Sequence, residues 1–267
     1  MAACHPRHET IRELLAERGR CGVEELAETL AVTTMTIRRD LSAMEKAGVL
    51  TRTHGGCVLR SPFVKEVPFS TKDQQRRVQK YAIAREAARR LPRGASVYLD
   101  TGTTAVHLAR WLPTDCDLRV FTNNLRVALE LFGRQGVEVV VFGGVLARNS
   151  PDLTGELALA RLQDFRFDVA VLGADAVNAR RGEFYSADMG TALLSRTVQK
   201  QADRTVVVAD SSKFGKQSLV VAGRLSADLT LVTDPELGKK DRAALEASGA
   251  EIVYASPETS GNARLVS

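Results

Sequence analysis

The sequence predicts a chain of two unequal domains: a small domain of three helices and a β-hairpin, and a larger α/β domain with a mostly parallel sheet covered on both faces. In the first sixty of the 267 residues, three segments carry apolar residues at helical spacing, and two β-prone runs flanking a Gly-Gly turn follow them. After about residue 75, short apolar runs alternate with helical ones, which is typical of a parallel sheet. We therefore expect domains at 1–60 and 75–255, a linker at 61–74 and a loose tail at 256–267.

The composition excludes several classes of protein. Hydrophobic residues make up 44% and charged residues 26%, as in an ordinary globular protein. No run of about 18 apolar residues occurs, and the first residues lack the apolar core of a secretory signal, so we expect a cytoplasmic protein without a membrane span. The four cysteines are scattered and form no CxxC pair, which indicates neither a disulfide framework nor a metal site. We expect no cofactor.

The positive charge is unevenly distributed. The net charge is +5, and residues 61–90 alone hold eight basic and three acidic residues. Residues 1–60 are nearly balanced, with nine basic and eight acidic residues. This basic segment is consistent both with an arm lying beside a phosphate backbone and with a solvated helix face.

The helices of the first domain follow from their apolar spacing. Apolar residues recur at helical intervals over 9–18 and over 23–30. A third helix begins where Thr33 or Thr34 can cap it and extends to about Ala47. A Gly follows and can end it in a left-handed conformation.

One face of this third helix has the composition of a nucleic-acid contact. Ile37, Leu41 and Met44 share an apolar stripe, which predicts the buried side. The other side chains combine cations with short hydrogen-bonding groups, the mixture that holds phosphates and reads base edges. The candidate DNA-contacting residues of the helix are Thr34, Met35, Thr36, Arg38, Arg39, Ser42 and Lys46.

The segment after the third helix predicts a β-hairpin with basic side chains near its tip. Two β-prone runs over 49–59 flank Gly55-Gly56, and Arg52 and His54 lie close to the turn. Three helices followed by such a hairpin make a winged helix-turn-helix, which binds DNA. The alternative is a small helical subdomain whose arginines are only solvated.

The sequence VEELAETLAVTTMTIRRDLSAMEKAGVLTRTHGGCVL closely resembles the N-terminal domain of DeoR-family transcription regulators. The resemblance covers most of residues 6–60, and its TIRRDL…LxRTHGG signature is highly specific. It implies that the helix from about Thr33 to Ala47 enters the major groove and that the hairpin touches the backbone. The expected partner is a double-stranded DNA operator.

The second domain is predicted as an alternation of strands and helices. The expected strands are Val97–Leu99, Leu118–Phe121, Val137–Phe142, Val169–Leu172, Thr205–Ala209, Leu229–Val232 and Glu251–Tyr254. Helices are expected between them, including Thr104–Leu112, Leu125–Phe132, Thr191–Gln201 and Asp241–Ala247. Residues 72–90 are expected to form one helix before the first strand.

Small and polar residues follow five of these strands. Because ligands of open α/β sheets bind outside the carboxyl ends of the strands, we expect the five segments to form one pocket. The chemistry fits an anion with hydroxyl groups, since Gly102-Thr103-Thr104 enters a helix whose free N–H groups suit a phosphate. The candidate ligand-binding residues are Asp100, Gly102, Thr103, Thr104, Asn123, Gly143, Gly144, Asp175 and Lys213.

Residues 75–255 also look like the effector domain of the DeoR family, whose fold is similar to that of sugar-phosphate isomerases such as ribose-5-phosphate isomerase. The matching segments are LDTGTT, the TN at 122–123, FGG at 142–144, FDVAVLGAD at 167–175 and ADSSKFGK at 209–216. The resemblance implies a phosphorylated sugar or related metabolite as effector, with phosphate contacts from Gly102, Thr103, Thr104 and Lys213. It also implies a repressor of carbohydrate-metabolism genes.

The pocket departs from the family in one place. After the GAD segment, family members commonly carry a Glu-Ala pair and then a Lys-Arg pair. Here those positions read Thr191-Ala192 and Ser195-Arg196, which changes the polarity expected of one pocket wall.

Two alternatives remain at the level of the sequence. The chain could be a sugar-phosphate isomerase with a DNA-binding appendage, but Ala176 and Val177 stand where related isomerases carry a further acid, so we expect no catalytic residue. It could instead be an architectural DNA-binding protein whose α/β domain only oligomerises. Because a helix-turn-helix normally reads repeated half-sites, we expect a homodimer or a higher homo-oligomer.

Overall fold

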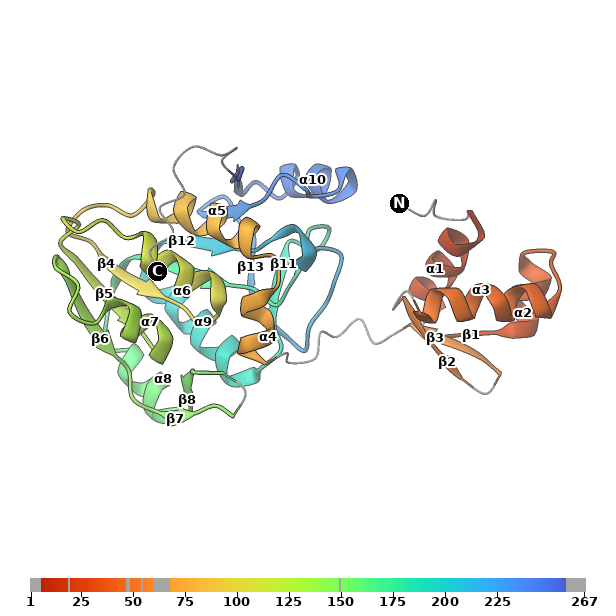
Figure 1. Ribbon diagram of the computed structural model, residues 1–267, viewed down its shortest axis with the longest axis horizontal. Coiled ribbons are helices and arrows are strands. Elements are labelled where there is room, and N and C mark those ends of the chain that lie inside the picture. The colour runs from red at the N-terminus through yellow and green to blue at the C-terminus, as the bar shows by residue number, and fades with distance from the viewer. Residues whose placement is uncertain are drawn as a thin grey trace. The chain divides into compact units, whose positions relative to one another are not determined.

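The computed structural model describes residues 6–18, 20–46, 49–53, 55–59, 68–148 and 150–257. The chain separates into two compact units, Met1–Pro62 and Phe63–Ser267, shown in Figure 1. Of the expected tail 256–267, residues 258–267 lie outside the described part.

The first unit combines three helices with a small antiparallel sheet. The sheet has the strand order β1-β3-β2, so the predicted hairpin gains a third strand at Arg20–Gly22 that the apolar spacing did not reveal. Its elements are α1 (Pro6–Arg18), β1 (Arg20–Gly22), α2 (Val23–Thr29), α3 (Thr34–Lys46), β2 (Leu50–Thr53) and β3 (Gly56–Leu59).

This unit has a hydrophobic core of its own. Ile11 of α1, Leu26 of α2 and Ile37 of α3 are fully buried in one cluster. Thr33 caps α3, because its hydroxyl accepts a hydrogen bond from the Thr36 N–H at 3.2 Å. Gly56 is required by β1, since a Cβ at this position would lie 2.1 Å from the Cys21 carbonyl oxygen.

The second unit is built on a seven-stranded, fully parallel sheet with the order β15-β14-β12-β9-β4-β5-β6. The chain starts in the middle at β4, moves outward to β6 and then returns to the other side of β4 with β9. Every predicted strand is present, with bounds shifted by three residues at most. The strands are β4 (Ser96–Leu99), β5 (Leu118–Thr122), β6 (Val137–Val141), β9 (Phe167–Gly173), β12 (Ala202–Val208), β14 (Leu229–Thr233) and β15 (Glu251–Tyr254).

Helices cover both faces of this sheet. Alternate residues of each strand enter two different clusters, as the two-residue period of a strand requires. Val97 and Leu99 pack with α5, α6 and α7, whereas Tyr98 packs in the cluster that holds α8, α9 and α10. These helices are α5 (Arg77–Ala88), α6 (Thr103–Trp111), α7 (Leu125–Leu131), α8 (Glu156–Leu162), α9 (Met189–Gln201) and α10 (Lys239–Glu246).

Two further antiparallel pieces lie outside the main sheet. Neither was predicted. They are the pair β7 (Val145–Leu146) and β8 (Leu153–Thr154), and the sheet of β10 (Ala176–Asn178), β11 (Glu183–Ser186) and β13 (Val220–Arg224).

The expected linker needs a correction. Phe69–Gln74 forms the helix α4, so the second half of the segment 61–74 has regular structure and belongs to the second unit. The single helix expected over 72–90 is also wrong. It is two helices, α4 and α5, separated by Arg76 in the left-handed conformation, with φ of 56°.

Candidate nucleic-acid interface and ligand pocket

The exposed face of α3 agrees with the predicted one. Ile37, Leu41 and Met44 are buried, and a fourth buried residue, Asp40, accepts a hydrogen bond from Arg7 of α1 at 2.9 Å. Burial alone would raise the pKa of Asp40, but Arg7 and His8 outweigh it and hold the pKa below its usual value. Of the seven candidate contact residues on α3, Thr36 and Ser42 are half-buried. The other five are exposed: Thr34, Met35, Arg38, Arg39 and Lys46.

The hairpin is tied to α3 at one point. The Arg52 guanidinium donates a hydrogen bond to the Ser42 hydroxyl at 2.7 Å, and the Arg52 N–H donates to Glu45 at 2.9 Å. These bonds fix the side chain of Arg52 beside α3. His54, the other candidate of the hairpin, lies outside the described residues.

A cavity of about 410 Å³ opens at the carboxyl ends of the central strands of the second unit. Segments that follow β4, β9 and β12 line it, and so do α4, the start of α9 and the β7–β8 connection. The neighbours β4 and β9 are connected to strands on opposite sides of the sheet. Their carboxyl ends are therefore the point where a crevice forms in a doubly wound sheet.

The N-terminus of α6 forms one wall of the cavity. Thr103 and Thr104 begin the helix and line the pocket, and the first N–H groups of a helix have no partner within it. Gly102 precedes them with φ of 107°, which a residue with a side chain rarely adopts. The arrangement suits an anion.

Asp100 lies at the floor of the cavity with only 2% of its surface exposed. Its Oδ2 accepts a hydrogen bond from the Gly173 N–H at 3.0 Å, whereas its Oδ1 has no hydrogen-bond partner among the residues that the structure describes. Burial raises the pKa of Asp100 to about 7. A buried polar atom without a partner is costly, so Oδ1 is suited to a ligand's hydroxyl group.

Four cations line the same cavity: Lys72, Lys80, Arg148 and Lys213. Lys72 of α4 donates to Asp175 Oδ1 at 2.6 Å. Burial alone would raise the pKa of Asp175, but the Lys72 ammonium outweighs it and holds the pKa below its usual value. Burial also lowers the pKa of Lys213, and it lowers that of Lys80 to about 8.

The wall that departs from the family carries hydroxyl groups. Thr191 and Ser195, both of α9, line the cavity, and Ser195 is only 1% exposed. Asp188 caps α9 by accepting hydrogen bonds from the Thr191 N–H at 2.7 Å and the Thr191 hydroxyl at 3.0 Å. This wall therefore presents short neutral donors where the resemblance implies a carboxylate and an ammonium.

Six of the nine predicted ligand-binding residues line the cavity, and three do not. Asn123 is 1% exposed, and its amide oxygen and nitrogen bond to the Tyr98 hydroxyl and the Leu153 carbonyl, so it holds the strand ends together. Gly143 and Gly144 form the turn into β7, where a Cβ on Gly144 would lie 2.5 Å from the Thr154 carbonyl oxygen. The strand-end argument failed for these three because β5 and β6 lie on the far side of β4 from β9.

Sequence reasoning missed several residues of the pocket. Lys72 and Lys80 come from the basic segment 61–90, whose charge excess was a visible signal, but that signal was attributed to DNA or to solvent. Asp210 was not among the candidates, although it lies two residues after the end of β12 and lines the cavity with Lys213. Arg148 lies in a connection without a recognisable pattern.

Membrane-spanning helices and metal-ligand clusters were sought among the described residues. None of the described helices combines the length and the apolar character that crossing a membrane requires. Within the same residues, no three His, Cys, Asp or Glu side chains gather in a way that could hold a metal ion.

A winged helix-turn-helix followed by an α/β sensor unit defines a DNA-binding transcription regulator. The model of the DeoR-like helix-turn-helix domain matches residues 7–63, and that of the DeoR C-terminal sensor domain matches residues 75–235. The chain belongs to the DeoR family.

Curated relatives match nearly the whole chain. The HTH-type transcriptional repressor CsqR of Escherichia coli K12 is 34% identical over 93% of this chain and 95% of that protein. The glycerol-3-phosphate regulon repressor of the same organism is 32% identical over 85% and 90%. Among solved structures, ribose 5-phosphate isomerase A from Methanocaldococcus jannaschii overlaps with a TM-score of 0.39 and 20% identity, over 52% of this chain and 54% of that one. That overlap is too small to carry an argument about this chain.

Proposed function

We propose that this regulator represses carbohydrate-metabolism genes and leaves its operator when a phosphorylated sugar or related metabolite enters the cavity. One observation supports this most: a helix N-terminus and the Lys213 ammonium border the same cavity as the unpartnered Asp100 Oδ1. The first two suit a phosphate and the third suits a hydroxyl group. A relative named for the glycerol-3-phosphate regulon is in keeping with such a ligand.

On the DNA side, we propose that α3 enters the major groove and that Arg52 contacts the backbone. Since winged helices of this kind bind repeated half-sites, the acting species is a homodimer or higher homo-oligomer. Its proposed target is operator DNA, so we propose that it works in the cytoplasm. Sedimentation velocity of the free protein tests the oligomeric state, and a monomer at micromolar concentration would contradict it.

The central experiment needs an operator and a ligand. An operator can be selected from random duplexes with the parent protein, and fluorescence anisotropy can then follow its release by phosphorylated sugars, polyol phosphates and their unphosphorylated counterparts. We expect release by a phosphorylated compound only. Failure of every compound, both in release and in a thermal-shift assay, would favour the architectural alternative.

Lys213 supplies the matched variants for that experiment. Lys213→Met removes a charge that lines the cavity, so we expect it to raise the half-maximal concentration of the releasing metabolite. Lys216→Met removes an exposed charge nearby and serves as the control. Equal dose-response curves for Lys213→Met and the parent would place the ligand elsewhere.

The pocket is proposed to bind its ligand without converting it. Asp175 is followed by Ala176 and Val177, which are fully buried in β10, so this stretch offers no second acid for moving a proton between sugar carbons. We expect purified protein to leave pentose and hexose phosphates unchanged in a coupled isomerase assay. Product formed faster than about 1 s⁻¹, at the low end of usual enzyme rates, would favour the enzyme alternative.

A further inference from the structure

The helix α4 is the first described element after the winged helix, and it borders the ligand cavity. Phe69 and Lys72 of α4 line the cavity. None of its six residues, all within the described part of the chain, is buried. Phe69 is half-buried against the core that holds α5, α6 and α7, and the Arg126 guanidinium lies 5.9 Å from its ring centre, so this packing and the polar contacts of α4 together position the helix.

Those polar contacts are made with groups of the cavity and of α6. Lys72 binds Asp175 at 2.6 Å, and Lys80 of α5 donates a hydrogen bond to the Lys72 carbonyl oxygen. On the other side of α4, Asp73 lies 3.5 Å from Nε2 of His107 in α6. A ligand that rearranges the cavity cations would thus act on α4 directly.

The contact with His107 is incomplete in this arrangement. His107 is fully buried, and within the described part of the chain neither of its ring nitrogens has a hydrogen-bond partner. Burial lowers the pKa of His107 to about 4, so the ring is neutral and one of its nitrogens carries a proton to donate. A small movement of α4 would bring the Asp73 carboxylate within hydrogen-bond distance of that ring. Such a movement would give the ring a hydrogen bond that it lacks here.

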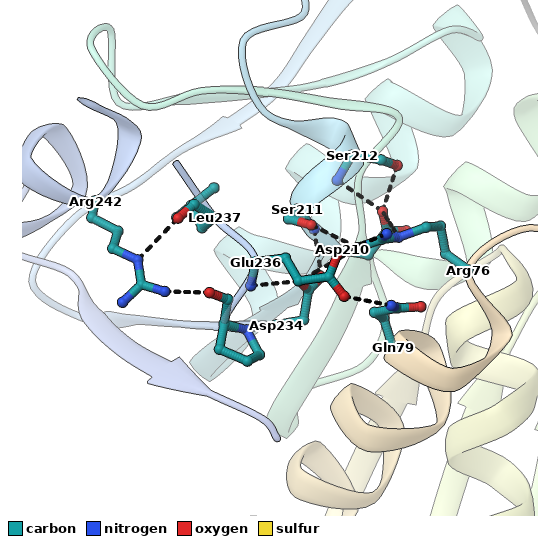
Figure 2. Close-up of polar contacts among 10 residues, drawn as sticks. Arg76, Gln79, Asp210, Ser211, Ser212, Asp234, Glu236, Leu237 and Arg242 are labelled. Atoms are coloured by element: carbon teal, nitrogen blue, oxygen red, sulfur yellow. Dashed lines mark hydrogen bonds and ion pairs between the residues drawn. The ribbon is translucent and has the colours of Figure 1, made fainter. Parts of the chain in front are cut away.

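The turn after α4 is held much more firmly than α4 itself. Arg76 donates hydrogen bonds to the Ser211 hydroxyl at 2.8 Å and to Glu236 at 3.0 Å, and it lies 3.5 Å from the fully buried Asp234 (Figure 2). Gln79, one turn into α5, also binds Glu236, at 2.7 Å. The start of α5 is thereby fixed to the ends of β12 and β14, and any movement of α4 is confined to the residues before Arg76.

We propose that Lys72 is a ligand-binding residue and that α4 transmits ligand binding toward the DNA-binding unit. The anionic group of the ligand binds at the start of α6 and replaces Asp175 as the partner of the Lys72 ammonium. As Lys72 moves to the anion, α4 shifts about the turn that Arg76 holds in place. This inference rests on the proposed function, because it assumes an anion in the cavity. It adds the residue and the element that respond to that anion.

The test uses inorganic phosphate as the probe and the full-length chain. Hydrogen–deuterium exchange, with labelling from milliseconds to minutes, follows α4 and residues 102–106 separately, and sodium chloride matches the ionic strength. In the parent we expect phosphate to slow exchange in both segments. In Lys72→Gln we expect it to slow only residues 102–106, at a higher phosphate concentration. Lys200→Gln, an exposed lysine of α9, should behave as the parent.

A second variant distinguishes direct binding of phosphate by Lys72 from an indirect effect of losing the ion pair between Lys72 and Asp175. Asp175→Asn leaves Lys72 without its carboxylate and removes a negative charge from the cavity. We therefore expect it to bind phosphate more tightly than the parent, whereas Lys72→Gln binds it more weakly. Equal or weaker phosphate binding by Asp175→Asn would mean that the ion pair does not compete with the ligand, and the proposal would fall.

The remaining outcomes separate this inference from the proposed function. Slower exchange at residues 102–106 of the parent without any change in α4 would overturn the role of α4 and leave the anion site standing. No change in either segment at saturating phosphate would overturn both. Melting temperatures of the variants, compared with that of the parent, identify any variant that fails to fold.

Discussion

At the scale of single residues, the buried carboxyl group of Asp100 predicts that the free energy of unfolding depends on pH. Burial raises its pKa to about 7, against 3.8 for an ordinary carboxyl group. Between these values the folded protein binds more protons than the unfolded chain, so the free energy of unfolding decreases as the pH rises. Each unit of pKa shift corresponds to about 1.4 kcal/mol. Relative to Asp100→Asn, which cannot ionise, we expect the parent to lose about 2–3 kcal/mol between about pH 5 and about pH 8.

Urea unfolding of both proteins at several pH values measures this difference. Taking the difference cancels the contributions of His107 and Lys80, which are present in both. Parallel pH profiles would show that Asp100 titrates as an ordinary carboxyl group and that the cavity floor is wetter than described.

The sequence revealed part of the pocket at this scale, and its limits have a physical cause. Asp100, Gly102 and Asp175 were predictable because each lies within three residues of the end of a central strand, where backbone direction alone brings residues to the cavity. Asn123 also follows a strand, but the Tyr98 hydroxyl and the Leu153 carbonyl occupy its side chain. Spacing along the chain does not reveal which polar atoms are already satisfied. Lys72 was hidden for a different reason, since it reaches the cavity from a helix that does not precede or follow a strand.

At the scale of elements, the exposed face of α3 predicts how DNA is read. Arg39 lies on the side away from the core, and we expect Arg39→Ala to cost about 1–3 kcal/mol of operator affinity if it contacts a base. Lys46, at the end of α3, should matter less. Arg52→Ala should instead weaken binding to all sequences alike and reduce the salt dependence by about one phosphate contact.

Anisotropy titrations at several salt concentrations, on selected and scrambled duplexes, separate these effects. Normal operator affinity of Arg39→Ala would mean that another face of the unit reads DNA. The bond from Arg52 to Ser42 makes Ser42→Ala a useful companion, since it frees the guanidinium without removing its charge.

The turn between α4 and α5 predicts a stability effect. Arg76 lies 3.5 Å from Asp234 and 3.9 Å from Asp210, whose side chains are 0% and 2% exposed (Figure 2). Removing one partner of a buried ionic group leaves an uncompensated charge, so we expect Arg76→Ala to lower the free energy of unfolding by about 2–4 kcal/mol. The exposed neighbour Arg77→Ala is the control and should cost less than about 0.5 kcal/mol in the same urea titration. Equal effects of the two would mean that water already screens the acidic pair.

The elements that the sequence predicted well are those whose packing repeats along the chain. The central strands of the large sheet are buried on both faces and leave continuous apolar runs, such as 169–172 in β9. The helix α4 leaves no such pattern, because it buries none of its six described residues. The strand β1 was missed because its three residues pair with β3, a partner far along the chain. The spacing of apolar residues thus identifies elements that bury a face. It does not identify elements that are held by polar contacts or by pairing with a distant strand.

At the scale of the whole molecule, the two units are expected to be thermodynamically linked. If a metabolite weakens operator binding by some factor, operator DNA must weaken metabolite binding by the same factor. Typical couplings are about 1–3 kcal/mol, or about 5- to 150-fold in affinity. Calorimetric titration of the releasing metabolite, with and without a saturating operator duplex, measures the second factor. Unequal factors would indicate a third species, such as a change of oligomeric state.

The position of α4 also bears on how such regulators can be recombined. The residues proposed to read DNA and those proposed to bind the ligand belong to units with separate hydrophobic cores, so a chimaera could take its operator from one relative and its inducer from another. The join cannot be placed freely, however. A crossover after Gln74 would give one parent's α4 to the other parent's pocket, and Lys72 would face a carboxylate and a ligand that it does not match. Joining the parents ahead of Pro68 keeps α4 with its own pocket, and this is where we expect functional hybrids to be found.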